Sequence, residues 1–336
     1  MIRSIVAPAE SPIHEDFTPS RNLPREKLEV ELKGDFLLWM DVVDGTEEEI
    51  RWLESVLDLH PSVVEDLMRD DRHPSLLVYP KYLFMSLFEP YFKANKIESK
   101  EIHCLIGDNY FVTVRKSDVK AADEAYNRAA MSASSWRKGL PYFLYLTIQY
   151  TIDAYYPLVD RISVHLNHLE EGLMLDEENN TKQPKNPRKA VYRTKQQLNI
   201  LRQMVSPQRE VLSNLISAER MTQEDSTSDL FRHLYERLLR IYDVIDAQRD
   251  LASNVIDMVD GKEASKLSAT VSRLTILSMI FLPLTFFTGL FQLNFTTTND
   301  PLVLPVSGTI LFLFIVALMF ISVAGLVLLF RRRGWI

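Results

Sequence analysis

The chain has 336 residues, of which 46% are hydrophobic and 25% are charged, and its formal net charge is −7. This size leaves room for two domains or for one large domain. The sequence has only ten glycines, no glycine-rich phosphate loop, and no nucleophile–base pair or metal-ligand spacing typical of hydrolases, so we do not expect an enzyme.

An α/β domain is predicted over residues 36–140, after an N-terminal segment over residues 1–35 that has no sustained apolar run and is therefore not a secretory signal. FLLWMDVV, which begins at Phe36, is typical of a strand, and TEEEIRWLESVLDL opens with the Thr-x-x-Glu pattern of a helix capping box. LLVYPKYLFMSLFEPYF and EIHCLIGDNYFVTVRK predict further strands. The single cysteine, Cys104, lies in one of these runs, so we expect a small buried side chain in a reducing cytosol.

Long helices are predicted from residue 141 onward. Residues 141–225 keep apolar side chains at three-four spacing in two helices, which a polar hairpin separates. A third helix is expected to run without interruption from Ser228 to about Asn294, roughly 100 Å at 1.5 Å per residue. Its apolar seam has one polar member and consists of Phe231, Leu234, Leu238, Ile241, Ile245, Gln248, Ala252, Val255 and Val259.

This seam suggests how the third helix is used. So long a helix has few partners in its own chain, and we therefore expect copies of the chain to pack along the seam. A symmetric ring of such helices would place its axis along the seam and continue it into a membrane as a path. A monomeric or dimeric signalling stalk is the alternative.

Charged residues are absent from Leu274 to Asn299, and again from Leu302 to Phe330. Because about 20 helical residues cross the hydrocarbon core of a bilayer, both stretches predict transmembrane helices. Two buried core helices are the alternative, but protein would have to cover each of them on all sides. Basic residues precede the first span and follow the second, so both termini are expected in the cytoplasm. These basic residues are Lys262, Lys266, Arg273, Arg331, Arg332 and Arg333.

Eight segments result from these patterns. They are an N-terminal segment (1–35), a cytoplasmic α/β domain (36–140), a helical pair (141–225), a cytoplasmic stalk helix (226–273), a first transmembrane helix (274–294), an outer loop (295–301), a second transmembrane helix (302–330) and a basic cytoplasmic tail (331–336). The outer loop is too short to form a domain.

The stretch FLPLTFFTGLFQLNF, residues 281–295, resembles the end of the pore helix in the CorA superfamily of two-span magnesium channels. Other stretches resemble CorA segments in the family's order. They include LHPSVVEDLMRDDRHPSLLVYPKYLFMSLF, LPYFLYLTIQYTIDAYYPLVDRI, LRQMVSPQREVLSNL, FRHLYERLLRIYDVIDAQRDLASNVIDM and RRRGWI. The resemblance covers about residues 36–336.

The resemblance implies an α+β membrane protein that assembles as a funnel-shaped homopentamer in a bacterial inner membrane. Residues 141–225 would form the family's antiparallel willow helices, and the stalk helix would line the pore. The implied function is passive transport of Mg²⁺ or a related cation such as Co²⁺ or Ni²⁺, with membrane lipids as neighbours and with neither a covalent cofactor nor nucleic acid. The alternatives are Zn²⁺ transport, as in the zinc branch of the superfamily, and a pentameric scaffold or sensor that does not conduct.

The resemblance also implies an ion-selective outer mouth. Where the family has Gly-Met-Asn, this chain has Gln292, Leu293 and Asn294. Because Mg²⁺ gives up its water reluctantly, neutral amide oxygens suit its hydration shell, and Asn294 is the expected amide. The change from glycine to Gln292 adds a side chain near the axis, which could plug the mouth or offer further amide oxygens.

Residues at helical spacing before the mouth are implied to line the pore. Thr285 would contact water of the ion, while Leu274 and Leu282 would form apolar constrictions that gate by dewetting. Ordinary helix packing is the alternative for these residues, and solvation is the alternative for Asp257. The complete implied set is Gly289, Thr285, Leu282, Leu274, Val271 and Asp257.

A regulatory metal site is implied between neighbouring subunits. Its first half matches Glu65 and Asp66, but His233 occupies the position of the family's stalk aspartate. An imidazole suits Zn²⁺, Co²⁺ or Ni²⁺, so the sensor is either lost or shifted toward softer metals or toward pH, unless His233 is only a polar interface residue. His165 and His168 lack a third ligand and are expected on a solvated surface. Arg331, Arg332 and Arg333 would form the family's basic collar.

Overall fold

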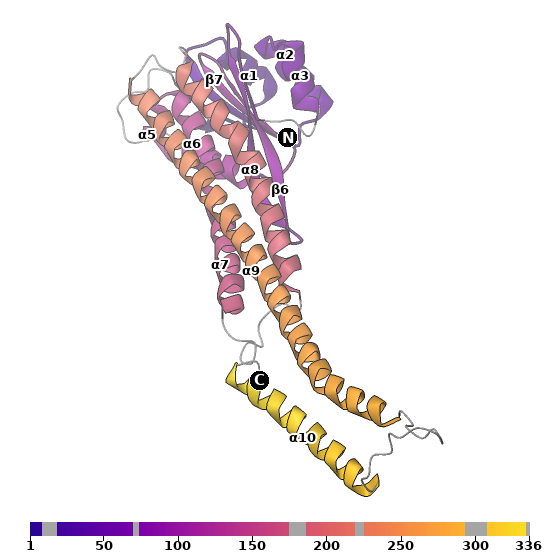
Figure 1. Cartoon of the computed structure of the whole chain (residues 1–336). Helices are drawn as coiled ribbons and strands as arrows, with labels where there is room; N and C mark the ends of the chain where they lie inside the picture. Colours follow the sequence, from indigo (N-terminus) through magenta and orange to yellow (C-terminus); the bar gives the residue numbers. More distant parts are fainter. Residues whose placement is uncertain (9–18, 70–73, 175–185, 219–224, 293–307, 334–336) are drawn as a thin grey trace. The chain divides into compact units, whose positions relative to one another are not determined.

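The computed structural model describes residues 1–8, 19–69, 74–174, 186–218, 225–292 and 308–333 (Figure 1). The chain divides into two units, residues 1–257 and residues 258–336. One helix, α9 (Asp225–Gln292), passes from the first unit into the second.

Among the described residues, a seven-stranded sheet organises the first unit. β3 (Phe36–Val43) and β7 (Tyr110–Arg115) lie parallel at its centre, and the other neighbouring pairs are antiparallel. The order is β2-β1-β3-β7-β6-β5-β4. The remaining strands are β1 (Ile2–Pro8), β2 (Ser20–Arg21), β4 (Ser75–Val78), β5 (Leu83–Lys93) and β6 (Lys96–Ile106).

The α/β domain begins earlier than the sequence analysis predicted. β1 pairs with β3 along its whole length, from Ile2 opposite Val42 to Pro8 opposite Phe36. Residues 1–35 are therefore not a separate segment, because their first strand belongs to the sheet. The polar pair Arg3-Ser4 interrupts the apolar pattern of β1, so the local sequence favours a strand only weakly. Pairing with β3 stabilises the strand in the folded domain.

Helices cover both faces of the sheet. One face carries α1 (Arg25–Glu31), α2 (Glu47–Leu57) and α3 (Pro61–Met68), whose apolar side chains share a buried cluster with the strands. The other face carries α4 (Lys120–Met131), α5 (Ala133–Trp136) and α6 (Leu140–Asp153). There the ring of Trp39 lies with its centroid 4.9 Å from that of Phe111 and 5.2 Å from that of Phe143. The buried area on both faces is the main stabilising contribution to this domain.

Two sequence predictions for this domain, the capping box at Thr46 and the burial of Cys104, are confirmed. At the start of α2, the Thr46 hydroxyl accepts a hydrogen bond from the Glu49 N–H at 3.3 Å, and the Glu49 carboxylate accepts one from the Thr46 N–H at 3.1 Å. This is the predicted capping box. Cys104 is fully buried, and burial raises the pKa of its thiol, so the thiolate is disfavoured.

A buried cluster of ion pairs joins β1, β3, β7 and α4. Arg115 Nη2 donates to Asp41 Oδ2 at 3.0 Å and to Asp123 Oδ1 at 2.7 Å. Arg3 donates to the same two carboxylates, and the Thr113 hydroxyl donates to Asp41 Oδ1 at 2.6 Å. Asp41 and Arg115 are almost completely buried, so each depends on the other for compensation of its lost hydration. The sequence analysis did not identify this cluster.

The first long helical stretch is broken. α6 ends at Asp153, and α7 (Tyr156–Met174) begins after a short turn, although the apolar spacing predicted continuity. Pro157 explains the break, since it has no N–H to donate to the carbonyl of Asp153 and its ring crowds that carbonyl. The next helix is α8 (Pro187–Ser217).

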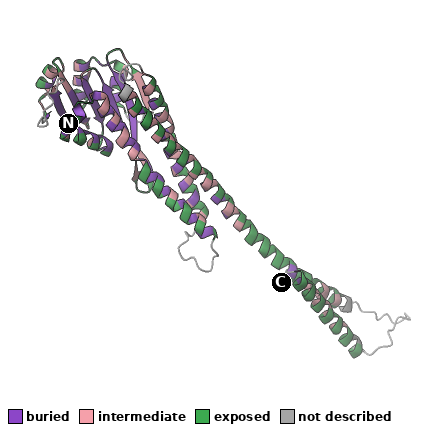
Figure 2. Ribbon diagram, turned by 90° about the vertical axis from the view of Figure 1, so that its left-hand side faces the viewer, coloured by how far each residue is buried: buried purple, intermediate pink, exposed green. Residues whose placement is uncertain are grey.

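The apolar seam of α9 is covered by the chain itself. Eight of its nine members are buried in the single chain, and the ninth, Gln248, is half-buried (Figure 2). Side-chain bonds join the same helix to α8 and α6: Arg202 donates to Asp246 at 2.8 Å, Lys195 donates to Ser253 at 2.9 Å, and Arg237 pairs with Asp153. The expectation that copies of the chain cover this seam is therefore wrong.

The second unit contains the remainder of α9 and α10 (Gly308–Arg332). Both helices are long and apolar enough to cross a membrane. Large apolar side chains are widely exposed here, for example Leu282 at 72% and Phe320 at 74%. The predicted unbroken helix is confirmed up to Gln292, with Pro283 inside it, and its 68 residues span about 100 Å at 1.5 Å each.

Candidate functional site

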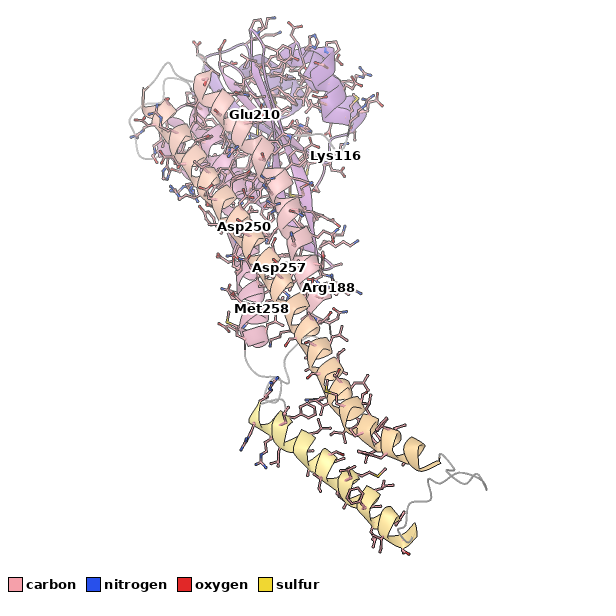
Figure 3. The ribbon with its side chains drawn as sticks, viewed as in Figure 1. Lys116, Arg188, Glu210, Asp250, Asp257 and Met258 are labelled. Carbon is pink, nitrogen blue, oxygen red and sulfur yellow. The ribbon has the colours of Figure 1, made fainter. Side chains whose placement is uncertain are left out.

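The exposed residues of α9 differ in chemistry between the first and the second unit. Steps of seven residues on an α-helix return to nearly the same side, with a drift of about 20° each. In the first unit, one face of α9 carries only exposed carboxylates at such steps, and Figure 3 labels two of them, Asp250 and Asp257. The five carboxylates are Asp229, Glu236, Asp243, Asp250 and Asp257. In the second unit, Ala264, Val271, Ser278, Thr285 and Gln292 follow at the same seven-residue steps, but the drift adds up to about 80° between Asp257 and Thr285 on a straight helix.

This acidic face of the first unit was only partly predicted. Asp257 was proposed from the resemblance, whereas the other four carboxylates were not identified. Their seven-residue spacing is present in the sequence, but a run of charged residues on a helix more often marks only its solvated side. The structure shows that the seam and the acidic face differ: the seam is buried in the chain, and the carboxylates are exposed.

The helix backbone orients the hydroxyl groups of Ser278 and Thr285 in the second unit. Thr285 Oγ1 donates to the carbonyl of Phe281 at 2.9 Å, and Ser278 Oγ donates to the carbonyl of Leu274 at 2.9 Å. Each hydroxyl has used its single proton, so its oxygen faces outward as an acceptor. An oxygen acceptor suits the hydrogen atoms of water around a cation. Ser278 was not predicted, although it lies four residues from both Leu274 and Leu282.

The predicted constriction residues Leu274 and Leu282 and the predicted pore-lining residue Val271 are more than half exposed in the single chain. Val271, Leu274 and Leu282 are 53%, 63% and 72% exposed. Gly289 has open space beside its helix, since no atom outside the neighbouring helix backbone lies within 4 Å of the position that a Cβ would occupy. Exposure in one chain means that only lipid, another copy or the ion path can cover these residues. Their role as pore lining stays a prediction.

The outer mouth lies largely outside the described residues. Gln292 is the last residue of α9, but its side chain is not described, and neither Leu293, Asn294 nor the loop 295–301 lies within the described residues. The predictions for these residues are therefore untested by the geometry.

The predicted regulatory residues are placed on two elements of the first unit. Glu65 and Asp66 lie on α3, which starts at Pro61 with the His60 ring accepting from the Ser62 N–H. Glu65 is exposed and pairs with Arg69 at 2.6 Å, whereas Asp66 is buried. His233 is exposed on α9. The described residues contain no group of three or more His, Cys, Asp or Glu side chains that could hold a metal, so no complete site exists within one chain there.

Arg331, Arg332 and Arg333, the predicted basic collar, lie at the C-terminal end of α10 in the second unit. Arg331 and Arg332 form the last turn of α10, and the Arg333 N–H donates to the carbonyl of Leu329 at 3.1 Å. All three side chains are exposed. Cationic side chains at the end of a helix interact favourably with its carbonyl groups and with anionic headgroups.

The sequence matches a known family model and several known proteins. The family model for CorA-like Mg²⁺ transporter proteins matches residues 35–332. The chain is 24% identical over 322 residues to a protein described as a metal ion transporter, YfjQ of Bacillus subtilis, with 94% of each chain covered. It is 27% identical over 268 residues to the cobalt/magnesium transport protein CorA of Thermotoga maritima, covering 77% of this chain and 75% of the relative.

The fold is also found among solved structures. The complete structure of the CorA magnesium transporter from Methanocaldococcus jannaschii superimposes with a TM-score of 0.77 at 18% sequence identity, and the match covers 99% of this chain and 98% of that one. This likeness extends over both units, so the α/β domain, the long helix and the two candidate membrane helices share one known architecture.

Proposed function

The chain belongs to the family of CorA-like Mg²⁺ transporter proteins, and from this membership we propose that it transports Mg²⁺ or a related divalent cation passively across a membrane as a homopentameric channel. The observation that supports the proposal best is α9 itself, one continuous helix that carries exposed carboxylates in the first unit and exposed apolar side chains and oriented hydroxyls in the second.

A ring of five such helices would provide the carboxylates, the apolar constriction and the hydroxyl oxygens that a hydrated cation meets along the path. The carboxylates attract cations on the cytoplasmic side, and rings of Val271, Leu274 and Leu282 make a dewetted constriction that stops leakage when the ring is narrow. For an ion that enters from outside, the acceptor oxygens of Thr285 and Ser278, which receive hydrogen bonds from its water, come before the carboxylates. No energy-coupling domain is required, because a potential of 100 mV, negative inside, favours influx of a divalent cation by about 4.6 kcal/mol.

We infer further details from the same family membership. Asn294 and Gln292 form the outer mouth, both termini lie in the cytoplasm of a bacterial cell, and α10 faces the lipid of the inner membrane with its basic end at the headgroups. Glu65, Asp66 and a neighbouring subunit's His233 form a regulatory contact that prefers Zn²⁺, Co²⁺ or Ni²⁺ to Mg²⁺, since the histidine replaces an oxygen ligand.

Flux through the purified full-length protein tests the proposal. Proteoliposomes with an imposed potential, negative inside, are expected to take up Mg²⁺, Co²⁺ or Ni²⁺ faster than protein-free liposomes of the same lipid. Uptake of Zn²⁺ alone would instead support the zinc alternative. Uptake of none of the four ions would contradict a channel and leave a membrane scaffold as the function.

The acidic face is expected to control conductance from the cytoplasmic side. Replacing Asp243, Asp250 and Asp257 together with asparagine should lower the cation current that starts on that side about tenfold at low ionic strength, because charge-lined openings raise the local cation concentration. The difference should shrink in about 0.5 M salt, where the screening length falls to a few ångströms. Recording in planar bilayers with the cation on the cytoplasmic-domain side measures this.

A matched control removes equal charge elsewhere. Glu26, Asp35 and Glu124 are exposed carboxylates on the α/β domain, and their neutralisation should leave the current unchanged. Equal losses in both triple variants would mean that only total charge matters, and the α9 face would then have no special role.

A further inference from the structure

A cavity of about 350 Å³ lies in the first unit, between α7, α8 and the turn that joins β5 to β6. The turn consists of Ala94 and Asn95, both with positive φ, and it brings Phe92 toward the helices. Ile162 and Thr194 are buried and form the floor. The cavity belongs neither to the α9 face nor to the predicted regulatory contact.

Two arginines and a histidine line this cavity. Arg161 and His165 reach it from α7, and Arg193 reaches it from α8. Within the described part of the chain, no carboxylate lines the cavity, and neither arginine has an ion-pair partner. Lys96, at the start of β6, adds an exposed cation beside the turn. Both arginines are exposed, whereas the buried Arg115 of the same unit contacts two carboxylates.

Several of these groups are held in place before any ligand binds. The guanidinium carbon of Arg161 lies 4.6 Å from the centre of the Phe92 ring, a cation–π contact that restricts the side chain. Gln197 Nε2 donates to the carbonyl of Asn95 at 3.0 Å, which fixes α8 against the turn. Positioned donors lose less freedom on binding than mobile ones, so the cavity is prepared for a ligand.

The histidine contributes a hydrogen-bond donor rather than a metal ligand. Burial lowers the pKa of His165, and the neighbouring His168 and Arg161 lower it further. The imidazole is therefore neutral near pH 7 and keeps one ring N–H. The guanidinium groups of Arg161 and Arg193, which line the same cavity, disfavour a metal cation there.

We propose that this cavity binds an anion that carries a phosphate group. The planar fork of arginine matches phosphate oxygens in pairs, and two forks from facing helices can hold one phosphate together. Cavities for small molecules usually have about 300–1,000 Å³, so this one has room for more than a bare phosphate ion. A nucleotide and the headgroup of an anionic phospholipid share the required chemistry.

Binding to the full-length protein in detergent micelles tests the proposal. Inorganic phosphate and adenosine 5′-monophosphate are titrated by calorimetry, and retention of phosphatidylglycerol against phosphatidylcholine is measured by native mass spectrometry. At least one of the three phosphate probes is expected to bind, and the successful probe distinguishes a soluble ligand from a lipid. If none binds, the proposal is wrong.

Substitutions locate the binding. Arg161→Gln and Arg193→Gln should each weaken the successful probe about tenfold, because each removes a charge-assisted pair of hydrogen bonds. Arg161→Lys keeps the charge but loses the fork and should give an intermediate loss, which also guards against a folding defect in the glutamine variant. Arg128→Gln, at an exposed arginine of α4, is the control and should bind normally. Equal affinity in all variants would overturn the proposal even if a probe binds.

Discussion

Asn294→Ala is expected to reduce Mg²⁺ influx into proteoliposomes at least about a hundredfold, while the protein keeps its oligomeric state. Each hydrogen bond to the water of a hydrated ion contributes about 1 kcal/mol, so the five equivalent amides of the proposed pentamer would together contribute about 5 kcal/mol to ion binding at the proposed mouth. Alanine removes all five at once. Asn167→Ala, at an exposed asparagine of α7, is the control and should leave the influx unchanged.

Gln292→Gly separates two explanations of the glutamine at the mouth. If the unchanged protein conducts and the glycine variant changes only the order of preference among Mg²⁺, Co²⁺, Ni²⁺ and Zn²⁺, the glutamine amide takes part in selection. If only the glycine variant conducts, the glutamine plugs the mouth and the protein acts as a scaffold. Normal influx in Asn294→Ala would place the selective amide elsewhere and contradict the proposed mouth.

The sequence predicted the central strands and the long helix because their signals are local. An apolar run at FLLWMDVV, a capping box at Thr46 and the lack of any stop before Pro283 each depend on neighbouring residues only. β1 was missed for the opposite reason: its polar interruption is tolerated only because β3 lies beside it, and that pairing joins residues about 35 positions apart.

The apolar seam of α9 shows a second limit of sequence patterns. Heptad spacing indicates that a helix buries one stripe, but it does not say whether another chain or the same chain covers the stripe. Here α8 and α6 bond to that helix through Asp246, Ser253 and Arg237, and the stripe is buried within one chain. Asp257 and Thr285 are among the residues of α9 that stay exposed in the single chain.

The buried ion cluster could not have been found from the sequence, since its members come from four separate elements. Removing one member should have a large effect on stability. Asp41→Ala is expected to lower the free energy of unfolding of the α/β domain by about 3–5 kcal/mol, because it leaves the buried Arg115 guanidinium with only part of its compensation. Chemical denaturation of the full-length protein in detergent, followed by tryptophan fluorescence, measures this change. Trp39 is a suitable reporter, because its indole N–H donates to the Thr113 hydroxyl at 3.1 Å beside the cluster.

Two further variants decide whether the buried charge is the cause. Asp41→Leu combined with Arg115→Met removes both charges and should recover much of the lost stability, since an apolar pair needs no compensation. Asp58→Asn breaks the exposed pair with Lys81 and should have no measurable effect. If the double variant is no more stable than Asp41→Ala, lost packing and not the unpaired charge explains the result.

The cluster should also set the acid limit of the domain. Burial raises the pKa of Asp123, but hydrogen bonds and charge from Arg115 and Arg3 lower it by more, so the pKa of Asp123 in the folded domain is below its ordinary value. A carboxylate with a lowered pKa contributes its stability above the unfolded pKa of about 3.9 and loses it as the pH falls through the folded value. We therefore expect Asp123→Asn to be less stable than the unchanged protein at pH 7, with the two converging as the pH falls below about 4. A difference that stays constant down to the lowest pH would show that ionisation of Asp123 does not stabilise the fold.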